Sequence, residues 1–170
     1  MEEALQRMSG VDLSNINGIS TNTALKIVAE IGIDMSRWKT SKQFASWLGL
    51  CPGAKISGGK VLSSATKQVA NRAATALRMA ALTLFNSKSA LGAYLRRQRA
   101  RMGAPKAITA TAHKLARLIY SMLKHGKAFV NTGQEQYEER YQSRILQNLK
   151  RKAQEMGYKL VSINEGQQTA

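Results

Sequence analysis

Acidic side chains are absent from the middle of this 170-residue chain, and this gap restricts its structure more than any other feature. Between Asp34 and Glu135 there is no Asp or Glu, whereas eighteen Lys and Arg fall in that interval, and the net charge of the chain is +16. Cations without partners stay at the surface, where they repel one another unless a polyanion neutralises them. The sequence therefore predicts a protein that presents its cations outward and binds a polyanion.

The same gap excludes several kinds of active site. Paired carboxylates, whether for acid–base chemistry or for holding two metal ions, cannot be assembled from the central hundred residues. Cys51 is the single cysteine, which excludes a disulfide framework and a multi-cysteine zinc site, and His113 and His125 are too few for a conventional zinc catalyst. We therefore expect no metal or cofactor in this chain, and structural or solvent-facing roles for these three residues.

The candidate polyanions are nucleic acid and an anionic membrane. A membrane-binding helix alternates its basic residues with bulky apolar ones, whereas the basic segments here carry Ala, Thr and Ser between the charges. No apolar run reaches the length that spans a bilayer. The sequence favours a cytoplasmic protein that binds nucleic acid and no membrane.

Helix is the expected secondary structure because Ala and Leu are abundant and only Pro52 and Pro105 interrupt the chain. The predicted fold is all-α: a helix-hairpin-helix is followed by a loop-interrupted helical bundle and a long C-terminal helix. The expected organisation is a helical domain over 1–130, with the helix-hairpin-helix at 11–32 and an active loop at 51–62, and a C-terminal helix and tail over 131–170.

Three helices carry the residues of interest. A helix beginning at Ser64 is expected to place Lys67, Asn71 and Arg78 on one polar stripe. A second, from about Ser89 to Arg101, and a third, from about Gln134 to Met156, follow along the chain. Trp38 and Trp47 are expected to be core residues, since both fall in short predicted helices with apolar neighbours. The last helix has an apolar face at Tyr137, Tyr141, Ile145 and Leu149.

The segment LSNINGISTNTA at 13–24 has the pattern of a helix-hairpin-helix. In that element the hairpin amides and the N-terminus of the second helix bind a phosphate, because unpaired N–H groups attract an anion. Gly18, Ser20 and Thr21 are the residues expected at that contact. The alternative is an ordinary antiparallel helix pair joined by a tight turn.

The loop KISGGK at 55–60 admits two interpretations. Ser57 is either a nucleophile flanked by Lys55 and Lys60, or part of a solvated turn that binds phosphate. Because no His or Asp lies nearby to activate the hydroxyl, the pattern alone favours the turn, with Gly58 and Gly59 giving it flexibility.

The arginines at 96–101, together with Lys106, form the densest group of cations. Solvated helix faces usually mix the two signs of charge, and this region has no acid. We therefore interpret Arg96, Arg97 and Arg101 as part of a nucleic-acid-binding face, with an ordinary solvated face as the alternative.

Three stretches of the chain resemble the C-terminal transposase domain of IS110-type insertion-sequence transposases, which move DNA with a bridge RNA. The order of helix-hairpin-helix, Ser-Gly-Gly loop and basic helix carries the resemblance. The stretches are NGISTNTALKIVAEIG at 17–32, FASWLGLCPGAKISGGKVLSSATKQVANRAATALRMAA at 44–81 and SALGAYLRRQRARMGAPKAITATAHKLARLIYSMLKHG at 89–126.

The resemblance implies a mechanism in which an N-terminal domain holds Mg²⁺ with four carboxylates and a serine of the C-terminal domain attacks DNA to form a phosphoserine intermediate. It identifies Ser57 as that serine and reverses the interpretation from pattern alone, since the missing base would come from another domain. The residues implied to shape and line the nucleic-acid face are Gly58, Gly59, Lys60, Lys67, Asn71, Arg72 and Arg78.

The resemblance also implies partners. The four carboxylates are not in these 170 residues, so we expect the chain to act as a fragment that binds nucleic acid without cutting it, and to need Mg²⁺ only when joined to the carboxylate domain. The implied partners are DNA, a guide RNA and further copies of the chain.

Because the expected contacts are to phosphate, nucleic-acid affinity should depend steeply on salt. If six to ten phosphates are neutralised, the association constant should fall by about 10³ to 10⁵ between 50 and 200 mM salt. Titration of labelled DNA at several salt concentrations measures this slope. A flat response would contradict the phosphate-binding interpretation.

Overall fold

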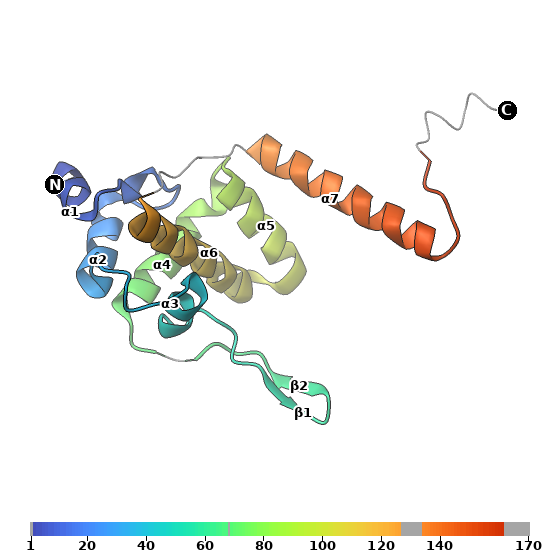
Figure 1. Cartoon of the computed structure of the whole chain (residues 1–170), viewed down its shortest axis with the longest axis horizontal. Coiled ribbons are helices and arrows are strands. Elements are labelled where there is room, and N and C mark those ends of the chain that lie inside the picture. Colours follow the sequence, from blue (N-terminus) through green and yellow to red (C-terminus); the bar gives the residue numbers. More distant parts are fainter. Residues whose placement is uncertain (1, 68, 127–133, 162–170) are drawn as a thin grey trace.

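The computed structural model describes residues 2–67, 69–126 and 134–161, which form a helical body with one small β-hairpin (Figure 1). This arrangement confirms the predicted all-α class in broad terms, with the hairpin as the departure from it. The elements are α1 (Glu2–Ser9), the 3₁₀ turn η1 (Leu13–Asn15), α2 (Thr21–Ile31), α3 (Ser41–Trp47), β1 (Lys55–Ser57), β2 (Lys60–Ser63), α4 (Arg72–Thr83), the 3₁₀ turn η2 (Leu84–Asn86), α5 (Ala90–Met102), α6 (Ala104–His125) and α7 (Gln134–Glu155).

Helix α6 lies at the centre of the body and packs against α3, α4 and α5 (Figure 1). Its apolar residues recur every three or four positions, so they share one face, and Ala112, Leu115 and Ile119 on that face are fully buried. Pro105 stands in the first turn, where its missing N–H leaves no hydrogen bond unmade, and Gly126 ends the helix with a left-handed conformation. Helix α6 is therefore the common partner of the three helices around it.

Helix α4 packs between α2 and α6 because its buried face is built from small residues. Ala73, Ala74, Ala80 and Ala81 are almost completely buried, and Leu77 is the one large side chain among them. Short side chains let the backbones of neighbouring helices approach closely. The close approach fixes the helix-hairpin-helix segment against α4.

A cluster of rings and hydrogen bonds joins α6 to the segment before α3. The Tyr120 hydroxyl donates to the Trp38 carbonyl oxygen at 2.8 Å, and Lys124 Nζ donates to the Lys39 carbonyl oxygen at 3.1 Å. The Trp38 ring meets Phe44 edge-on at 4.9 Å between centroids. Trp38 is thus a core residue as predicted, although it lies before α3 and not in a helix, whereas Trp47 stays 39% exposed at the edge of the cluster.

The predicted helix start at Ser64 is wrong, because α4 begins eight residues later at Arg72. Residues 64–67 instead run back along the chain segment that follows α3. The Gly53 N–H donates to the Ala65 carbonyl oxygen at 2.9 Å, and Pro52 pairs with Thr66 in an isolated β-bridge. Backbone pairing with another segment overrides the helical period of the sequence here. Lys67 therefore lies outside α4.

Helix α7 matches its prediction to within one residue at the C-terminal end, and it leaves the body at an angle (Figure 1). Its first turns contact α5. The tail predicted at 165–170 lies outside the described residues. Within the described part of the chain, no helix combines the length and the apolar character needed to cross a membrane.

Gly18 positions the hairpin of the helix-hairpin-helix against α4. Its φ is +88°, and a Cβ there would lie 2.9 Å from the Ala80 carbonyl oxygen and 2.9 Å from Leu84 Cγ. Gly32 provides a matched control, since its φ is +74° but a Cβ there would meet nothing within 4 Å. Both backbones lie in the region that disfavours side chains, so the two substitutions differ in the steric contact.

We expect Gly18→Ala to lower the free energy of unfolding by about 1–3 kcal/mol more than Gly32→Ala, which is the range for overpacking a tight contact. Urea unfolding followed by circular dichroism measures the difference. Equal losses in the two variants would mean that the contact with α4 contributes nothing.

Candidate nucleic-acid interface

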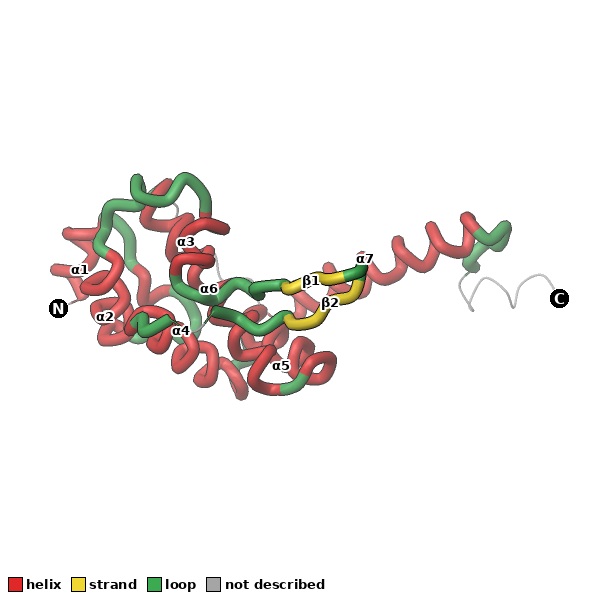
Figure 2. The backbone as a smooth tube through the Cα atoms, turned by 90° about the horizontal axis from the view of Figure 1, so that it is seen from below, coloured by secondary structure: helices red, strands yellow, loops and turns green. Residues whose placement is uncertain are grey.

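The segment predicted as an active loop is a β-hairpin that projects from the helical body (Figure 2). Strands β1 and β2 are joined by the two residues Gly58 and Gly59, whose φ values are +54° and +75°. A two-residue turn with both φ angles positive matches the twist of a hairpin and strongly prefers glycine. The two glycines thus form a defined turn rather than a flexible loop, and Ser57 stands directly before it.

The hairpin places the serine and two lysines on one face. Ser57 pairs with Lys60, and Lys55 pairs with Ser63. Paired residues share a face, and residues two apart on one strand do so as well, so all four lie on the same side. The pairing skips Leu62, which forms a bulge and brings Ser63 onto this side.

Every residue of β1 is exposed, so the Ser57 hydroxyl is open to a ligand. Lys55 and Lys60 are exposed as well, and their ammonium groups can neutralise a phosphate that approaches the serine. The opposite face carries Ile56, which is 64% exposed. The arrangement suits a hydroxyl nucleophile or a phosphate contact, and the hairpin itself contains no carboxylate or imidazole to accept the serine proton.

The described residues do not fit a Mg²⁺ site. Among residues 2–67, 69–126 and 134–161, no three His, Cys, Asp or Glu side chains come together. The hairpin lies inside the interval between Asp34 and Glu135, which has no acidic residue. Carboxylates that bind a metal beside Ser57 would have to come from outside this interval.

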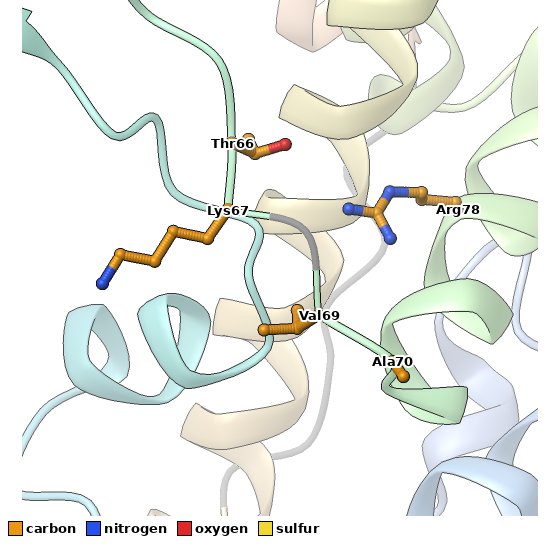
Figure 3. A pocket seen from close by; sticks show the side chains of 5 residues that line it. All are labelled: Thr66, Lys67, Val69, Ala70 and Arg78. Atoms are coloured by element: carbon orange, nitrogen blue, oxygen red, sulfur yellow. The ribbon is translucent and has the colours of Figure 1, made fainter.

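A shallow pocket of about 460 Å³ lies at the base of the hairpin, and Thr66, Lys67, Val69, Ala70 and Arg78 line it (Figure 3). The half-buried Arg78 extends from α4 toward Thr66, whereas the exposed Lys67 points away from it (Figure 3). The predicted polar stripe does not exist, since Lys67 and Arg78 come from different elements. Both residues nevertheless border one pocket, although the Lys67 ammonium points away from the Arg78 guanidinium (Figure 3).

Two further predicted residues begin α4. Asn71 caps the helix, and its side-chain oxygen accepts the Ala74 N–H at 3.0 Å. Arg72 is exposed, and its Nε lies 4.0 Å from Glu30 of α2. The Asn71 carboxamide oxygen is therefore occupied within the helix cap, while the Arg72 guanidinium faces solvent beside a carboxylate.

The helix-hairpin-helix has a shorter first element than predicted. Asp12 caps η1, which is a single 3₁₀ turn, and Ser20 caps α2 by accepting the Thr23 N–H at 3.3 Å. Gly18 packs directly against Ala80 and Leu84, so one side of its backbone contacts α4 and the turn that follows it. A pocket of about 520 Å³ lies between the turn of the helix-hairpin-helix and α4, and Asn17 is one of its lining residues. The buried Asn17 Oδ1 has no hydrogen-bond partner among the described residues.

The predicted arginine face divides into packed and exposed residues. Arg96 Nη1 donates to the carbonyl oxygens of Phe85 and Ser87 at 3.1 and 2.8 Å, which ties α5 to the η2 turn. The Arg97 guanidinium lies 3.4 Å from the centroid of the Tyr141 ring of α7. Arg101 is exposed.

The division follows from the helical period, because neighbouring residues point about 100° apart. Arg96 and Arg97 face the body and α7, respectively, whereas Arg101 and Lys106 remain exposed to solvent. The four cations therefore do not form one continuous face.

Sequence reasoning missed the contact between α7 and the basic helices. Lys114 of α6 lies 4.2 Å from the Tyr94 ring centroid and 5.5 Å from that of Tyr137. Burial lowers the pKa of the Lys114 ammonium, with a smaller contribution from nearby Arg144. The four-residue spacing of Tyr137 and Tyr141 was the available signal, since it places both rings on one side of α7.

Cys51, His113 and His125 lie outside the strands that carry Ser57 and its lysines. Burial lowers the pKa of the half-buried His113 imidazole and raises the pKa of the Cys51 thiol, while His125 is exposed. A raised thiol pKa reduces the thiolate fraction at neutral pH. None of the three is arranged as an activated nucleophile.

Residues 12–96, which are half of the chain, match the family model described as the transposase IS116/IS110/IS902 family. The matched region runs from the cap of η1 through the hairpin and α4 to Arg96 in α5. It therefore contains the whole hairpin face and the pocket at its base. Comparison with curated proteins finds no match.

The Arg96 contacts predict a role in stability. We expect Arg96→Ala to lower the free energy of unfolding by about 1–3 kcal/mol, because two carbonyl oxygens lose a charged donor. Arg101→Ala is the matched control on the same helix, and substitution at this exposed position should change stability by no more than about 0.5 kcal/mol. Thermal and urea unfolding compare the two, and equal stabilities would contradict the structural role of Arg96.

Proposed function

Because the chain belongs to the IS116/IS110/IS902 family of transposases, we propose that Ser57 is the nucleophile of its DNA strand-transfer chemistry. The family is that of insertion-sequence transposases, so DNA is a partner of the chain. The observation that carries the proposal is the hairpin face, where an exposed hydroxyl stands beside Lys55 and Lys60. This is the surface at which a DNA phosphate would meet the serine.

The proposed step is a transesterification. Ser57 Oγ attacks the phosphorus, a P–Oγ bond forms, and the bond from phosphorus to one deoxyribose oxygen breaks. The serine proton passes to a base outside the hairpin, and the departing deoxyribose oxygen takes up a proton. The DNA is then joined to the chain as a phosphoserine diester, so the energy of the phosphodiester is kept for rejoining.

Charge explains why the lysines belong to this site. Negative charge builds up on the phosphoryl oxygens as the fifth bond to phosphorus forms, and fixed cations stabilise that charge. Lys55 and Lys60 share the face of Ser57, so both ammonium groups can reach those oxygens. The Gly58-Gly59 turn lets the DNA backbone approach the serine without a side chain in the way.

We propose further contacts that hold the nucleic acid along the body. Arg78 would bind a phosphate in the pocket at the base of the β-hairpin, and Lys67, whose ammonium points away from Arg78, would bind a neighbouring phosphate. The turn of the helix-hairpin-helix, at Gly18, Ser20 and Thr21, would bind a further phosphate at the N-terminus of α2. The exposed Arg72 and Arg101 would add positive charge to the surface that the DNA contacts. These contacts bind backbone and do not by themselves read sequence.

We propose that the reaction also uses Mg²⁺, held by carboxylates from outside the interval between Asp34 and Glu135. When bound beside the serine, it would supply Lewis-acid activation of the phosphate. What this chain contributes is the nucleophile, the two lysines and the backbone contacts. A guide RNA and further copies of the chain are the additional partners that we propose for the complete reaction.

The second candidate is a nucleic-acid-binding module without chemistry, in which the hairpin only holds backbone. The absence of any carboxylate or imidazole from residues 55–63 favours it. The two candidates differ in one product, which is a covalent bond between protein and DNA.

The experiment supplies the chain with a family carboxylate domain, DNA, guide RNA and Mg²⁺, and detects protein–DNA adducts on denaturing gels. We expect an adduct with the unsubstituted chain and with Ser63→Ala, and none with Ser57→Ala. Ser63 is the matched control, because it is a serine on the same face and its pairing with Lys55 uses backbone atoms.

An adduct that persists in Ser57→Ala would eliminate Ser57 as the nucleophile. DNA binding by the unsubstituted chain with no adduct in the complete mixture would support the binding module instead. Binding measured by gel shift for both variants separates loss of chemistry from loss of affinity.

A further inference from the structure

The first turns of α7 meet α5 and α6 through tyrosine rings and cations. The Arg97 guanidinium carbon lies 3.4 Å from the centroid of the Tyr141 ring and 5.3 Å from that of Tyr137. Lys114 Nζ of α6 lies 5.5 Å from the same Tyr137 ring and 4.2 Å from the Tyr94 ring centroid. Beyond this junction α7 runs away from the body (Figure 1). One tyrosine of α7 is therefore shared by cations of two other helices.

Helical spacing places further cations at the same junction. Arg101 follows Arg97 by four residues on α5, and Arg144 follows Tyr141 by three residues on α7, so each lies on the side of its helix that meets the other. Both of these arginines are exposed. The group, which we name the junction cluster, consists of Arg97, Arg101, Lys114 and Arg144.

No carboxylate of the described residues pairs with the junction cluster. Within 2–67, 69–126 and 134–161, the ion pairs involve none of its four cations. Arg97 Nη1 is moreover buried without a hydrogen-bond partner there. Glu138 is next to Tyr137 in the sequence but lies about a quarter turn around α7 from the face of Tyr137 and Tyr141. Because a buried charged donor without an acceptor costs free energy, the junction lacks an anion.

The cations of the junction cluster also destabilise one another. Burial lowers the pKa of the Lys114 ammonium, and the positive charge of Arg144 lowers it further. Both effects mean that the charged form of Lys114 is less stable at the junction than in water. Placing α7 against the body therefore concentrates like charge. An anion at the junction would reverse this effect, because it would attract cations of all three helices.

The donors at the junction suit a phosphate. A guanidinium that stacks on a ring keeps the N–H groups at its edge for an anion, and an ammonium binds phosphate as a point charge. The Tyr94 hydroxyl is a further donor, since burial, together with the nearby Tyr137 hydroxyl, raises its pKa and keeps it protonated. Because DNA is a partner of the chain, the expected phosphate is one of a nucleic-acid backbone.

We propose that the junction cluster binds a phosphodiester of the nucleic-acid backbone, and that the bound phosphate holds α7 against α5 and α6. Arg97, Lys114 and Arg144 each contribute one cation from a different helix. The site lies beyond Arg96, where the family match ends, and on other elements than the hairpin face. It rests on the proposed function only in taking DNA as the partner, and it does not depend on Ser57.

The first experiment follows the position of α7 by pulsed electron paramagnetic resonance on the full chain. Spin labels are placed at the exposed positions Ser46 of α3 and Gln154 of α7 in a Cys51→Ser background. We expect a broad distance distribution for the chain alone and a narrow one with a short DNA duplex, because the phosphate neutralises the repulsion at the junction. An unchanged distribution at DNA concentrations that saturate binding in gel shifts would overturn the proposal.

Inorganic phosphate separates the two sources of the anion. DNA makes several phosphate contacts at once, so it should narrow the distribution at micromolar concentrations, whereas inorganic phosphate should need millimolar concentrations. Chloride keeps the ionic strength constant across the two titrations. Narrowing by inorganic phosphate at a lower concentration than by DNA would assign the junction to a free anion and overturn the assignment to nucleic acid.

The test variant is Arg144→Gln, and Lys150→Gln is its matched control. Both residues are exposed cations of α7, and Lys150 lies about 120° around the helix from Arg144. Arg144→Gln should reduce the slope of log affinity for DNA against log salt by about one and leave the distance distribution broad in the presence of DNA. Lys150→Gln should change neither result. Equal effects of the two variants would mean that general charge drives binding, which would overturn the proposal.

The junction site and the chemistry of Ser57 can fail separately. DNA that narrows the α7 distribution in Ser57→Ala would support the junction site even if no protein–DNA adduct ever formed. Conversely, an adduct in the complete mixture, together with an α7 that DNA does not fix, would overturn the junction site and keep Ser57 as the nucleophile.

Discussion

The burial of one face of α6 is the interaction on which the rest of the structure depends. Helices α3, α4 and α5 all pack against α6. Ala112, Leu115 and Ile119 have no exposed surface, so each neighbouring helix gains its stability from a shared partner. The Tyr120 and Lys124 hydrogen bonds then fix the segment before α3 to the same helix. The two ends of the hairpin, one after α3 and one before α4, are thereby both anchored to α6.

The sequence predicted the helices better than the segments between them. The bounds of α7 and the start of α5 near Ser89 were predictable because each depends on residues close together in the chain. The start of α4 was not, since Ala65 and Thr66 pair with a segment that the pattern could not identify. Gly49 contributes to that pairing, because a Cβ there would overlap Val69. A helical period is a local signal, and it fails where a distant backbone competes for the same residues.

The candidate site was predictable in its residue types and less so in its geometry. Ser57, Lys55 and Lys60 were chosen as neighbours in a loop, and their common face is set by the pairing of Ser57 with Lys60 in the strand register. Arg96 and Arg97 were chosen by charge, and charge does not distinguish a cation that binds phosphate from one that closes a turn or stacks on a tyrosine. Their partners, the Phe85 carbonyl and the Tyr141 ring, are 11 and 44 residues distant in the sequence.

The projection of the hairpin has a mechanical consequence. None of the strand residues whose burial the structure describes belongs to the core, and the two chain segments below the strands are joined by the Pro52–Thr66 bridge and the Gly53 hydrogen bond. A ligand that pulls on the Gly58-Gly59 turn would bend the two chain segments at this narrow base before it disturbed the packing of α6. Bending at this base would shift Ser57 relative to the helical body while leaving the packing around α6 unchanged.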